Sequence, residues 1–327
     1  DSIQEAVDAA TPGDRINLAA GVHEISETIH LDKPLIIGGA ARNGDELAPL
    51  PTVLKGAEGL TYVMQLQTGV GSGTALLDLR VETSSSGIQH LSGDITLRRC
   101  QIIVKSVLNF QKVISLEATG SDDRPTDTAT IDGCILSAEY VGDAAEHTPP
   151  DVDVVLTAPN TRYKEITVTH CEVTNEVPNR ISNGIETRGT TAHLTISDNR
   201  VRCRGMGIVF PNHRGAMDIR NNKVWAANVG IVVGTESPKR STIIGNHVHI
   251  DEQLFQVYPL FIRDYIADNS SVCIAVGATS AAVAEAFFKT KVIGRGMNIV
   301  VEQNTLKGNP KYGIAMMDSP TPENYGP

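Results

Sequence analysis

The feature that most constrains the fold is an internal repeat, in which a short alternating strand, a Cys or Asn, and a second alternating strand follow one another. The central residues of the repeat are Cys100, Cys134, Cys171, Asn199, Asn222, Asn246 and Asn304. A Gly-Ile pair recurs between these units, beginning at Gly87, Gly184, Gly207, Gly230 and Gly313. The pairs at 184, 207 and 230 are 23 residues apart. Two interlocked motifs with one period predict a coil of three strands that repeats along an axis.

One such coil cannot bury its apolar residues alone, whereas coils stacked about 4.8 Å apart share one continuous core. An Asn at the same turn of successive coils can bond to the next coil, so we predict an asparagine ladder of Asn199, Asn222 and Asn246. The Cys residues at this position in earlier coils are expected to be buried, inward-pointing thiols. The five cysteines are an odd number without Cys-x-x-Cys spacing, which argues against a disulfide framework or a zinc site. The sequence predicts one all-β solenoid domain over residues 1–327.

Residues 1–14 are predicted to form an N-terminal capping helix. Apolar side chains recur on one face of this helix, at Ile3, Ala6, Val7 and Ala10. The Thr-Pro-Gly-Asp sequence that follows ends the helix. An uncovered solenoid end would expose strand edges and apolar side chains, so a helix at this place protects it.

The longest interval between repeats contains a predicted insertion over residues 251–295. Residues 271–276, Ser-Val-Cys-Ile-Ala-Val, are typical of one further strand. Residues 281–289 are predicted to form a short inserted helix, because Thr and Ser precede them as N-caps. The segment 251–270 contains the most apolar loop of the chain, which favours contact with a second copy or a protein partner; the alternatives for the insertion are a lid and a cap.

The order of the first motifs carries a resemblance to a known superfamily. The chain opens with a helix, Pro12-Gly13-Asp14, Ile16-Asn17-Leu18, Gly21-Val22-His23 and Leu35-Ile36-Ile37-Gly38-Gly39. This order and the asparagine ladder resemble the pectate-lyase-like right-handed parallel β-helix superfamily, over essentially the whole chain. The resemblance implies a right-handed parallel β-helix. It is weak for activity, because this superfamily contains lyases, hydrolases, epimerases, tailspikes and non-catalytic modules.

The resemblance implies that sugar chains bind along the outer face of the Gly-Ile strands and in the loops that follow. Strand alternation places Glu186 on that face, with Val209 and Val232 at the same position in the next coils. The loops contain basic residues in three successive coils, and these are Arg188, His213, Arg214, Lys239 and Arg240. Stacked together they would form a basic band that suits an acidic polysaccharide.

β-Elimination on an acidic polysaccharide needs a base that removes a proton and a cation that stabilises the resulting anion. We assign the base to His213 or Arg188. Arg214 and Glu186 complete the candidate catalytic set. Binding of the substrate is assigned to Lys239 and Arg240. The alternative is that these loops are charged only because they are solvated.

A second set of outward side chains follows the ladder position in three coils. It consists of Arg200, Arg202, Lys223, Trp225, His247 and His249. Stacking would place Trp225 between Arg202 and His249. We assign Trp225 and Arg202 to substrate binding, as a sugar platform or a cation–π ladder. The alternative is a structural stripe that covers the sheet or packs under the insertion. Two His residues without a neighbouring carboxylate are a weak metal signal, so no metal site is predicted.

Signatures of the better-known enzymes of this superfamily are absent from the sequence. There is no aspartate cluster at the calcium-binding spacing of pectate lyases, no polygalacturonase signature and no Asp-Pro-His-Asp motif of alginate epimerases. No cofactor is therefore predicted, and calcium has no motif to support it. An enzyme with this sequence would be polysaccharide-lyase-like. The alternative is a non-catalytic β-helix for protein recognition, adhesion or structural assembly.

The net charge and the residue composition limit the classes of partner that the chain is expected to bind. The net charge of −10 argues against nucleic acid, because phosphate contacts supply most of that binding energy. No apolar stretch reaches the length of about 18 residues that predicts a membrane-spanning helix. Five unpaired cysteines permit a reducing, cytoplasmic compartment, whereas a carbohydrate-active protein would be extracellular. The compartment is therefore left open.

Overall fold

The computed structural model describes residues 2–41, 49–69, 73–106, 111–118, 126–141, 152–157, 161, 163–177, 183–187, 192–235, 239–251, 272–277, 299–308, 310 and 312–317. Within these residues the chain forms one helix, α1 (Ile3–Ala9), and thirty strands that make three parallel sheets of ten.

Each sheet collects one strand from every coil. Sheet A holds the strands before the ladder position: β1 (Arg15–Asn17), β4 (Ile36–Gly38), β7 (Gly73–Leu77), β10 (Asp94–Arg98), β13 (Asp127–Asp132), β16 (Tyr163–Thr169), β19 (His193–Ser197), β22 (Met217–Arg220), β25 (Ser241–Ile244) and β28 (Ile299–Glu302). Sheet B holds the strands after it: β2 (Gly21–Ile25), β5 (Thr52–Gly56), β8 (Arg80–Thr83), β11 (Gln101–Ser106), β14 (Ile135–Tyr140), β17 (Glu172–Asn175), β20 (Arg200–Cys203), β23 (Lys223–Ala226), β26 (His247–Ile250) and β29 (Thr305–Gly308). Sheet C includes the Gly-Ile strands: β3 (Ile29–Leu31), β6 (Tyr62–Gln67), β9 (Ser86–Ser92), β12 (Gln111–Leu116), β15 (Val152–Thr157), β18 (Asn183–Thr187), β21 (Met206–His213), β24 (Val229–Thr235), β27 (Val272–Gly277) and β30 (Tyr312–Met317).

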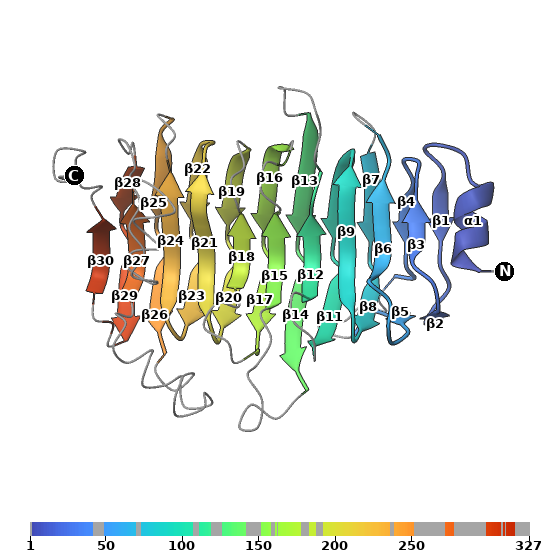
Figure 1. Ribbon diagram of the computed structural model, residues 1–327, viewed down its shortest axis with the longest axis horizontal. Coiled ribbons are helices and arrows are strands. Elements are labelled where there is room, and N and C mark those ends of the chain that lie inside the picture. Colours follow the sequence, from blue (N-terminus) through green and yellow to red (C-terminus); the bar gives the residue numbers. More distant parts are fainter. Residues whose placement is uncertain are drawn as a thin grey trace, which may run out of the picture.

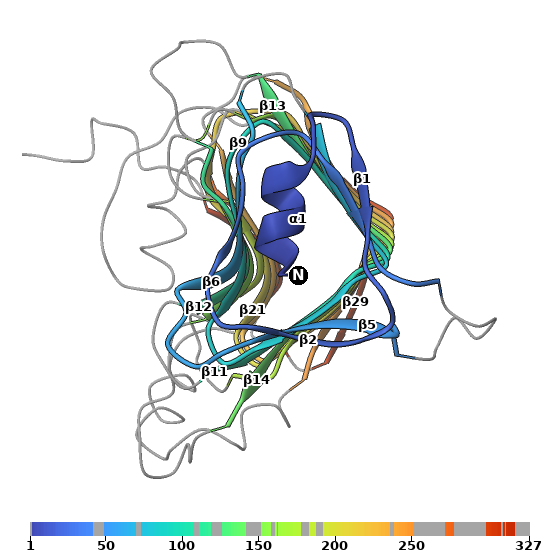
Figure 2. The same ribbon diagram turned by 90° about the vertical axis from the view of Figure 1, so that its right-hand side faces the viewer.

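The coils stack along the long axis of the molecule (Figure 1). Seen along that axis, the three sheets form the sides of one tube, and α1 lies across its N-terminal end (Figure 2). The chain is a right-handed parallel β-helix, as the sequence predicts.

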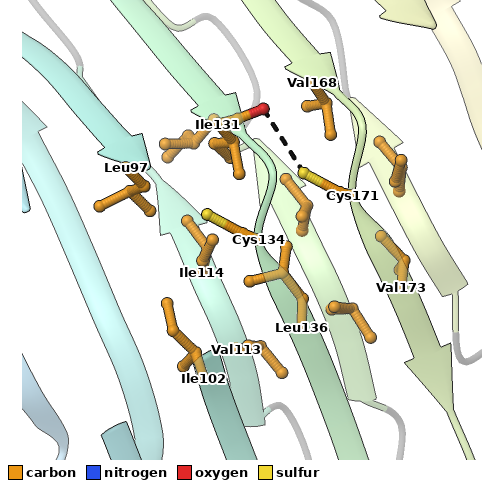
Figure 3. Packing of buried hydrophobic residues seen from close by; sticks show 14 of the residues in the cluster. Leu97, Ile102, Val113, Ile114, Ile131, Cys134, Leu136, Val168, Cys171 and Val173 are labelled. Atoms are coloured by element: carbon orange, nitrogen blue, oxygen red, sulfur yellow. Dashed lines mark hydrogen bonds between the residues drawn. The ribbon is translucent and has the colours of Figure 1, made fainter. Parts of the chain in front are cut away.

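The interior of the tube is filled by apolar side chains that stack in rows. Leu97, Ile131 and Val168 are in register in sheet A, and all three are buried (Figure 3). A second row, in sheet B, consists of Ile102, Leu136 and Val173. Full burial of each such side chain stabilises the fold by about 1.5–3 kcal/mol. The core therefore depends on stacking between coils, because each row is completed by its neighbours.

The predicted asparagine ladder is confirmed, and Asn304 extends it. Nδ2 of Asn199 donates to Oδ1 of Asn222 at 3.0 Å, and Nδ2 of Asn222 donates to Oδ1 of Asn246 at 2.9 Å. Nδ2 of Asn246 donates to Oδ1 of Asn304 at 3.0 Å. The second amide hydrogen of each Asn reaches a backbone carbonyl, as Asn199 does at Val168 (2.8 Å). These bonds pair the backbone and side-chain polar groups that the turns bury.

The cysteines of the earlier coils lie at the same position, inside the tube. Cys100, Cys134 and Cys171 are free and buried, as predicted, and so are Cys203 and Cys273, which lie elsewhere in the coils. The backbone N–H of Cys171 donates to Oδ1 of Asn199 at 2.9 Å, which joins the Cys coils to the asparagine ladder. Sγ of Cys171 also donates to the carbonyl oxygen of Ile131 at 3.5 Å (Figure 3).

The Gly-Ile glycines mark the corner between sheets B and C. Strand register places Gly184, Gly207 and Gly230 one coil apart, as predicted. A Cβ at Gly207 would lie 2.5 Å from Cγ1 of Val224 and 2.6 Å from the carbonyl oxygen of Gly230. Contacts this short exclude a side chain, so glycine is required by close approach of neighbouring coils.

Replacing Gly207 with Ala is expected to lower the free energy of unfolding by about 1–3 kcal/mol, because an added methyl overpacks the corner. Urea unfolding followed by circular dichroism measures this loss. Gly73→Ala is the matched control, since a Cβ there would meet only Cβ of Asp94 at 3.7 Å. Equal losses in the two variants would contradict the close-packing explanation.

The helix α1 caps the N-terminal end, although it is shorter than the predicted region 1–14. Ser2 is its N-cap: the backbone N–H of Glu5 donates to Ser2 Oγ at 3.1 Å, and that of Ser2 donates to Glu5 Oε2 at 2.7 Å. Nζ of Lys33 donates to the carbonyl oxygens of Asp8 and Ala10, both at 3.0 Å, beyond the other end of the helix. Both ends are thus satisfied by side chains, which fixes a helix of only seven residues.

Little of the predicted insertion 251–295 falls within the described residues. The expected further strand is present as β27 and pairs with β24 and β30. The predicted helix over 281–289 and the apolar segment 252–270 lie outside the described residues, so the boundaries of the insertion stay a prediction. In the described part of the chain, no helix is long and apolar enough to cross a membrane.

Candidate functional site

The outer face of sheet C carries a hydrogen-bonded row of polar side chains in the N-terminal half of the tube. Register places Gln65 between His30 and Gln89. Ser115 is the next residue in register after Gln89. Nδ1 of His30 lies 3.0 Å from Oε1 of Gln65, and Nε2 of Gln65 donates to Oε1 of Gln89 at 2.6 Å. Nε2 of Gln89 donates to Oε2 of Glu117 at 2.8 Å. We name these five residues the polar row.

Glu117 is the charged end of the polar row. Its Oε1 accepts hydrogen bonds from the hydroxyls of Tyr62 (3.3 Å) and Ser115, and Nζ of Lys112 lies 3.8 Å away. Burial, followed by the charge of Glu117, raises the pKa of Tyr62 to about 12, so this phenol stays protonated and acts as a donor. The Glu117 side chain is 24% exposed. Its carboxylate is therefore held in one orientation and remains reachable from solvent.

Glu186 lies further along the same face, in a buried cluster with Asp153 and Asn183. Nδ2 of Asn183 donates to Oδ1 of Asp153 at 3.0 Å and also to Oε2 of Glu186. Only 3% of Glu186 is exposed, and Val209, next to it in register, is buried as well. Glu186 is therefore on the face expected from the sequence, but it is enclosed rather than presented to solvent. Its catalytic role stays a prediction.

His213, the expected base, ends β21 and is fully buried. Its ring centre lies 6.4 Å from that of Phe210, which belongs to the core. Burial lowers the pKa of His213 to about 4, so the imidazole is neutral near pH 7. A buried imidazole cannot reach a polymer at the surface, which argues against His213 as the base of a β-elimination there.

The other basic loop residues lie on neighbouring turns between sheets C and A. Arg214 is exposed directly after β21, and Lys239 and Arg240 are exposed directly before β25. The two turns are adjacent, because the backbone N–H of Met217 donates to Oγ of Ser241 at 3.1 Å. The predicted band thus retains three exposed cations. Arg188 lies outside the described residues, and its catalytic role stays a prediction.

The outer face of sheet B carries a second cationic surface in the C-terminal half of the tube. Two rows of residues in register run across four strands. One row is Arg200, Lys223 and His247. The other row is Arg202, Trp225, His249 and Lys307. We name these seven residues the basic face. The four strands β20, β23, β26 and β29 contain no Asp or Glu.

Trp225 lies between Arg202 and His249 in register, as predicted. Its cation–π partner is Arg200, whose Cζ lies 5.4 Å from the ring centre, rather than Arg202. The side chain of Arg202 is 54% exposed and lies 4.0 Å from Oε1 of Glu176, at the N-terminal border of the basic face. Lys223 is exposed as well. The alternative, a structural stripe that covers the sheet or packs under the insertion, stays open, because most of the insertion lies outside the described residues.

The described residues include no group of three or more His, Cys, Asp or Glu that could hold a metal ion. His247 and His249 share the outer face of β26, but no carboxylate of that strand joins them.

The fold defines the class to which the chain belongs, that of right-handed parallel β-helix proteins. No model of a known protein family matches the chain, and no curated protein sequence matches it. Among solved structures, the chain is similar to one titled Geobacillus virus E2 ORF18, with a TM-score of 0.50 and 9% identity, covering 75% of this chain and 53% of that one. It is also similar to the Dettilon tailspike protein, with a TM-score of 0.50 and 11% identity, covering 93% of this chain and 58% of that one.

The chain therefore spans between half and three-fifths of the length of these two structures. At 9–11% identity the likeness shows the fold alone. The resemblance to the pectate-lyase-like superfamily stays a prediction below the level of the parallel β-helix.

Proposed function

We propose that this β-helix binds a polysaccharide along the outer face of sheet C, through the polar row. The observation that carries the proposal is the continuous hydrogen-bonded row from His30 to Glu117. Sugar hydroxyls both donate and accept, and carboxamide and carboxylate groups offer matching partners. Coils spaced about 4.8 Å apart present these partners at regular intervals, which suits a repetitive polymer.

Glu117 would orient a sugar rather than remove a proton from it. The carboxylate already accepts from Gln89, Tyr62 and Ser115, and Lys112 lies close to it. These donors already occupy both carboxylate oxygens, so Glu117 is fixed in place as a hydrogen-bond acceptor. The proposal is therefore binding without catalysis. A lyase-like step would have to use Arg188 as its base, because His213 is enclosed.

We further propose that the bound polysaccharide is acidic. Arg214, Lys239 and Arg240 are exposed on turns that adjoin the C-terminal half of sheet C. These cations would attract carboxylates of a sugar chain that continues beyond the polar row. The likeness to the Dettilon tailspike protein supports the proposal through the shared solenoid fold.

Replacing Gln65 and Gln89 together with Ala is expected to weaken polysaccharide binding about tenfold or more. Each lost hydrogen bond is worth about 0.5–1.5 kcal/mol, and 1.4 kcal/mol corresponds to a factor of ten. A panel of immobilised neutral and acidic polysaccharides identifies those that the protein retains, and calorimetric titration then compares the variants.

Thr167→Ala on the outer face of sheet A is the matched control, since Thr130, Thr167 and Thr195 form a polar row in register there. It should leave retention unchanged. If the protein retains no member of the panel, or if the Gln65→Ala/Gln89→Ala variant is retained as well as Thr167→Ala, the proposal is wrong.

A further inference from the structure

The basic face of sheet B concentrates positive charge on an otherwise acidic protein. The chain has a net charge of −10, yet the four strands of the basic face contain four Lys or Arg, two His and no Asp or Glu. Strand register stacks these residues from one coil to the next. Successive charges are therefore spaced about 4.8 Å apart.

None of the four strands contains an Asp or Glu; at the N-terminal border of the basic face, Glu172 of β17 is in register with Arg200, and Oε1 of Glu176 lies 4.0 Å from Nε of Arg202. His247 lies between Lys223 and Thr305 in register, and His249 and Lys307 are its basic neighbours in the adjoining row. The pKa of His247 is lowered first by desolvation and then by Coulombic interaction with Lys307, His249 and Lys223. The positive potential thus accumulates across coils, and an anion would relieve it.

Trp225 supplies a second kind of contact in the middle of the basic face. Its ring is partly exposed, and the guanidinium of Arg200 lies 5.4 Å from the ring centre. A sugar ring can stack on an exposed aromatic face while its acidic groups pair with the flanking cations. The arrangement combines one apolar platform with charges at regular spacing.

These features favour a sugar polymer over a nucleic acid. A flat sheet face does not enter a duplex groove, and single-stranded nucleic acid is usually bound by several stacked aromatic side chains. The basic face has one aromatic side chain, Trp225, which is the only Trp of the chain.

We propose that the basic face of sheet B is a second binding surface, which takes an extended polysaccharide carrying carboxylate or phosphate groups. The chain would cross β20, β23, β26 and β29, with its acidic groups on Arg200, Lys223 and Lys307 and a sugar ring against Trp225. This surface is separate from the polar row of sheet C, and it stands whether or not the polar row binds sugar.

The single Trp makes the surface directly measurable, because intrinsic tryptophan emission reports only on the basic face. Titration of the full chain with polygalacturonate, which carries carboxylates, is expected to change the emission of Trp225. A teichoic acid supplies the phosphate-bearing arm, and neutral dextran is the uncharged arm. The apparent affinity should fall as salt rises from 50 to 500 mM, because screening shortens the reach of exposed charges.

The Arg200→Gln/Lys223→Gln variant is expected to bind the acidic polymer at least about fivefold more weakly, since exposed charge pairs contribute up to about 1 kcal/mol each. The matched control is Lys55→Gln/Lys164→Gln, which removes the same charge from exposed positions outside the basic face. Both pairs are exposed, so folding is unaffected by design, and circular dichroism checks it.

Three results would overturn the proposal. Dextran could bind as tightly as both acidic polymers, or the Arg200→Gln/Lys223→Gln variant could match its control. A single-stranded oligothymidylate of equal charge could also bind as tightly as polygalacturonate, which would assign the surface to nucleic acid. The Gln65→Ala/Gln89→Ala variant tests only the polar row. If it loses polysaccharide binding while the Trp225 titration is unchanged, the basic face binds independently of the polar row.

Discussion

Replacing Asn222 with Ala is expected to lower the free energy of unfolding by about 3–4 kcal/mol. Asn222 donates to the carbonyl oxygen of Ile196 and to Asn246, and its Oδ1 accepts from both the backbone and the side chain of Asn199. Truncation leaves several of these buried partners unpaired, and each unpaired group costs about 1–3 kcal/mol. Equilibrium urea unfolding, monitored by circular dichroism, measures the loss.

Two further substitutions distinguish the stability lost with the hydrogen bonds from the stability lost with side-chain volume. Asn222→Cys should cost less than Asn222→Ala, because Cys occupies the same position in earlier coils and Cys171 donates to backbone carbonyls there. Asn304→Ala should also cost less, since Asn304 is only partly buried at the end of the ladder. If Asn222→Ala lowers the free energy of unfolding by less than about 1 kcal/mol, the asparagine ladder does not contribute substantially to the stability of the stacked coils.

The ladder and the corner glycines could be predicted because the same close contact recurs in every coil. Asn222 and Gly207 each touch their own counterparts one coil away, so the same residue type recurs at the same interval. Counting from the ladder also placed Trp225 between Arg202 and His249. The strand that follows the ladder runs straight from that fixed turn, so alternation holds along it.

His213 could not be placed by alternation, because the strand is irregular before it. The register of β21 with β24 shifts between Phe210 and His213. Regular alternation from the inward Ile208 and Phe210 would point residue 213 outward. The bulge adds one residue, and His213 is buried instead. The available signal was Pro211, which stands inside the irregular stretch, because a Pro within a strand is typical of a bulge.

The polar row was missed for a different reason. Its members vary in type, because an outward side chain need not match its neighbour in shape as a core residue must. The available signal was position: Gln65 lies between apolar Met64 and Leu66, and Gln89 follows Ile88 one coil later. Strands β6 and β12 lack the Gly-Ile pair, so the spacing of that pair gives no register for their outward residues.

Acidification is expected to destabilise the protein through two buried imidazoles. Only 1% of His90 is exposed and His213 is fully buried, and Nδ1 of His90 is hydrogen-bonded to the hydroxyl of buried Tyr163. Burial is the largest cause that lowers the pKa of each from 6.5 to about 4. Charging either ring inside the tube requires desolvation that the unfolded chain avoids.

The direction in which stability changes with pH follows from the number of protons that each state binds. Between pH 6.5 and 4 the unfolded chain binds a proton at each His and the folded chain does not, so stability falls as pH falls through this window. The stability is fully present above pH 6.5. By pH 4 each His has removed about 3 kcal/mol, at about 1.4 kcal/mol per pKa unit.

Urea unfolding at half-unit intervals from pH 7.5 to 4.5 gives the slope of unfolding free energy against pH. His213→Asn and His90→Asn should each reduce that slope by one proton in the window, whatever they do to absolute stability. His30→Asn, at an exposed position, is the control and should leave the slope unchanged. If all three variants keep the wild-type slope, the two buried rings do not control the response to acid. A reduced slope in both would instead tie acid sensitivity to the corner between sheets C and A, where the bulge encloses His213.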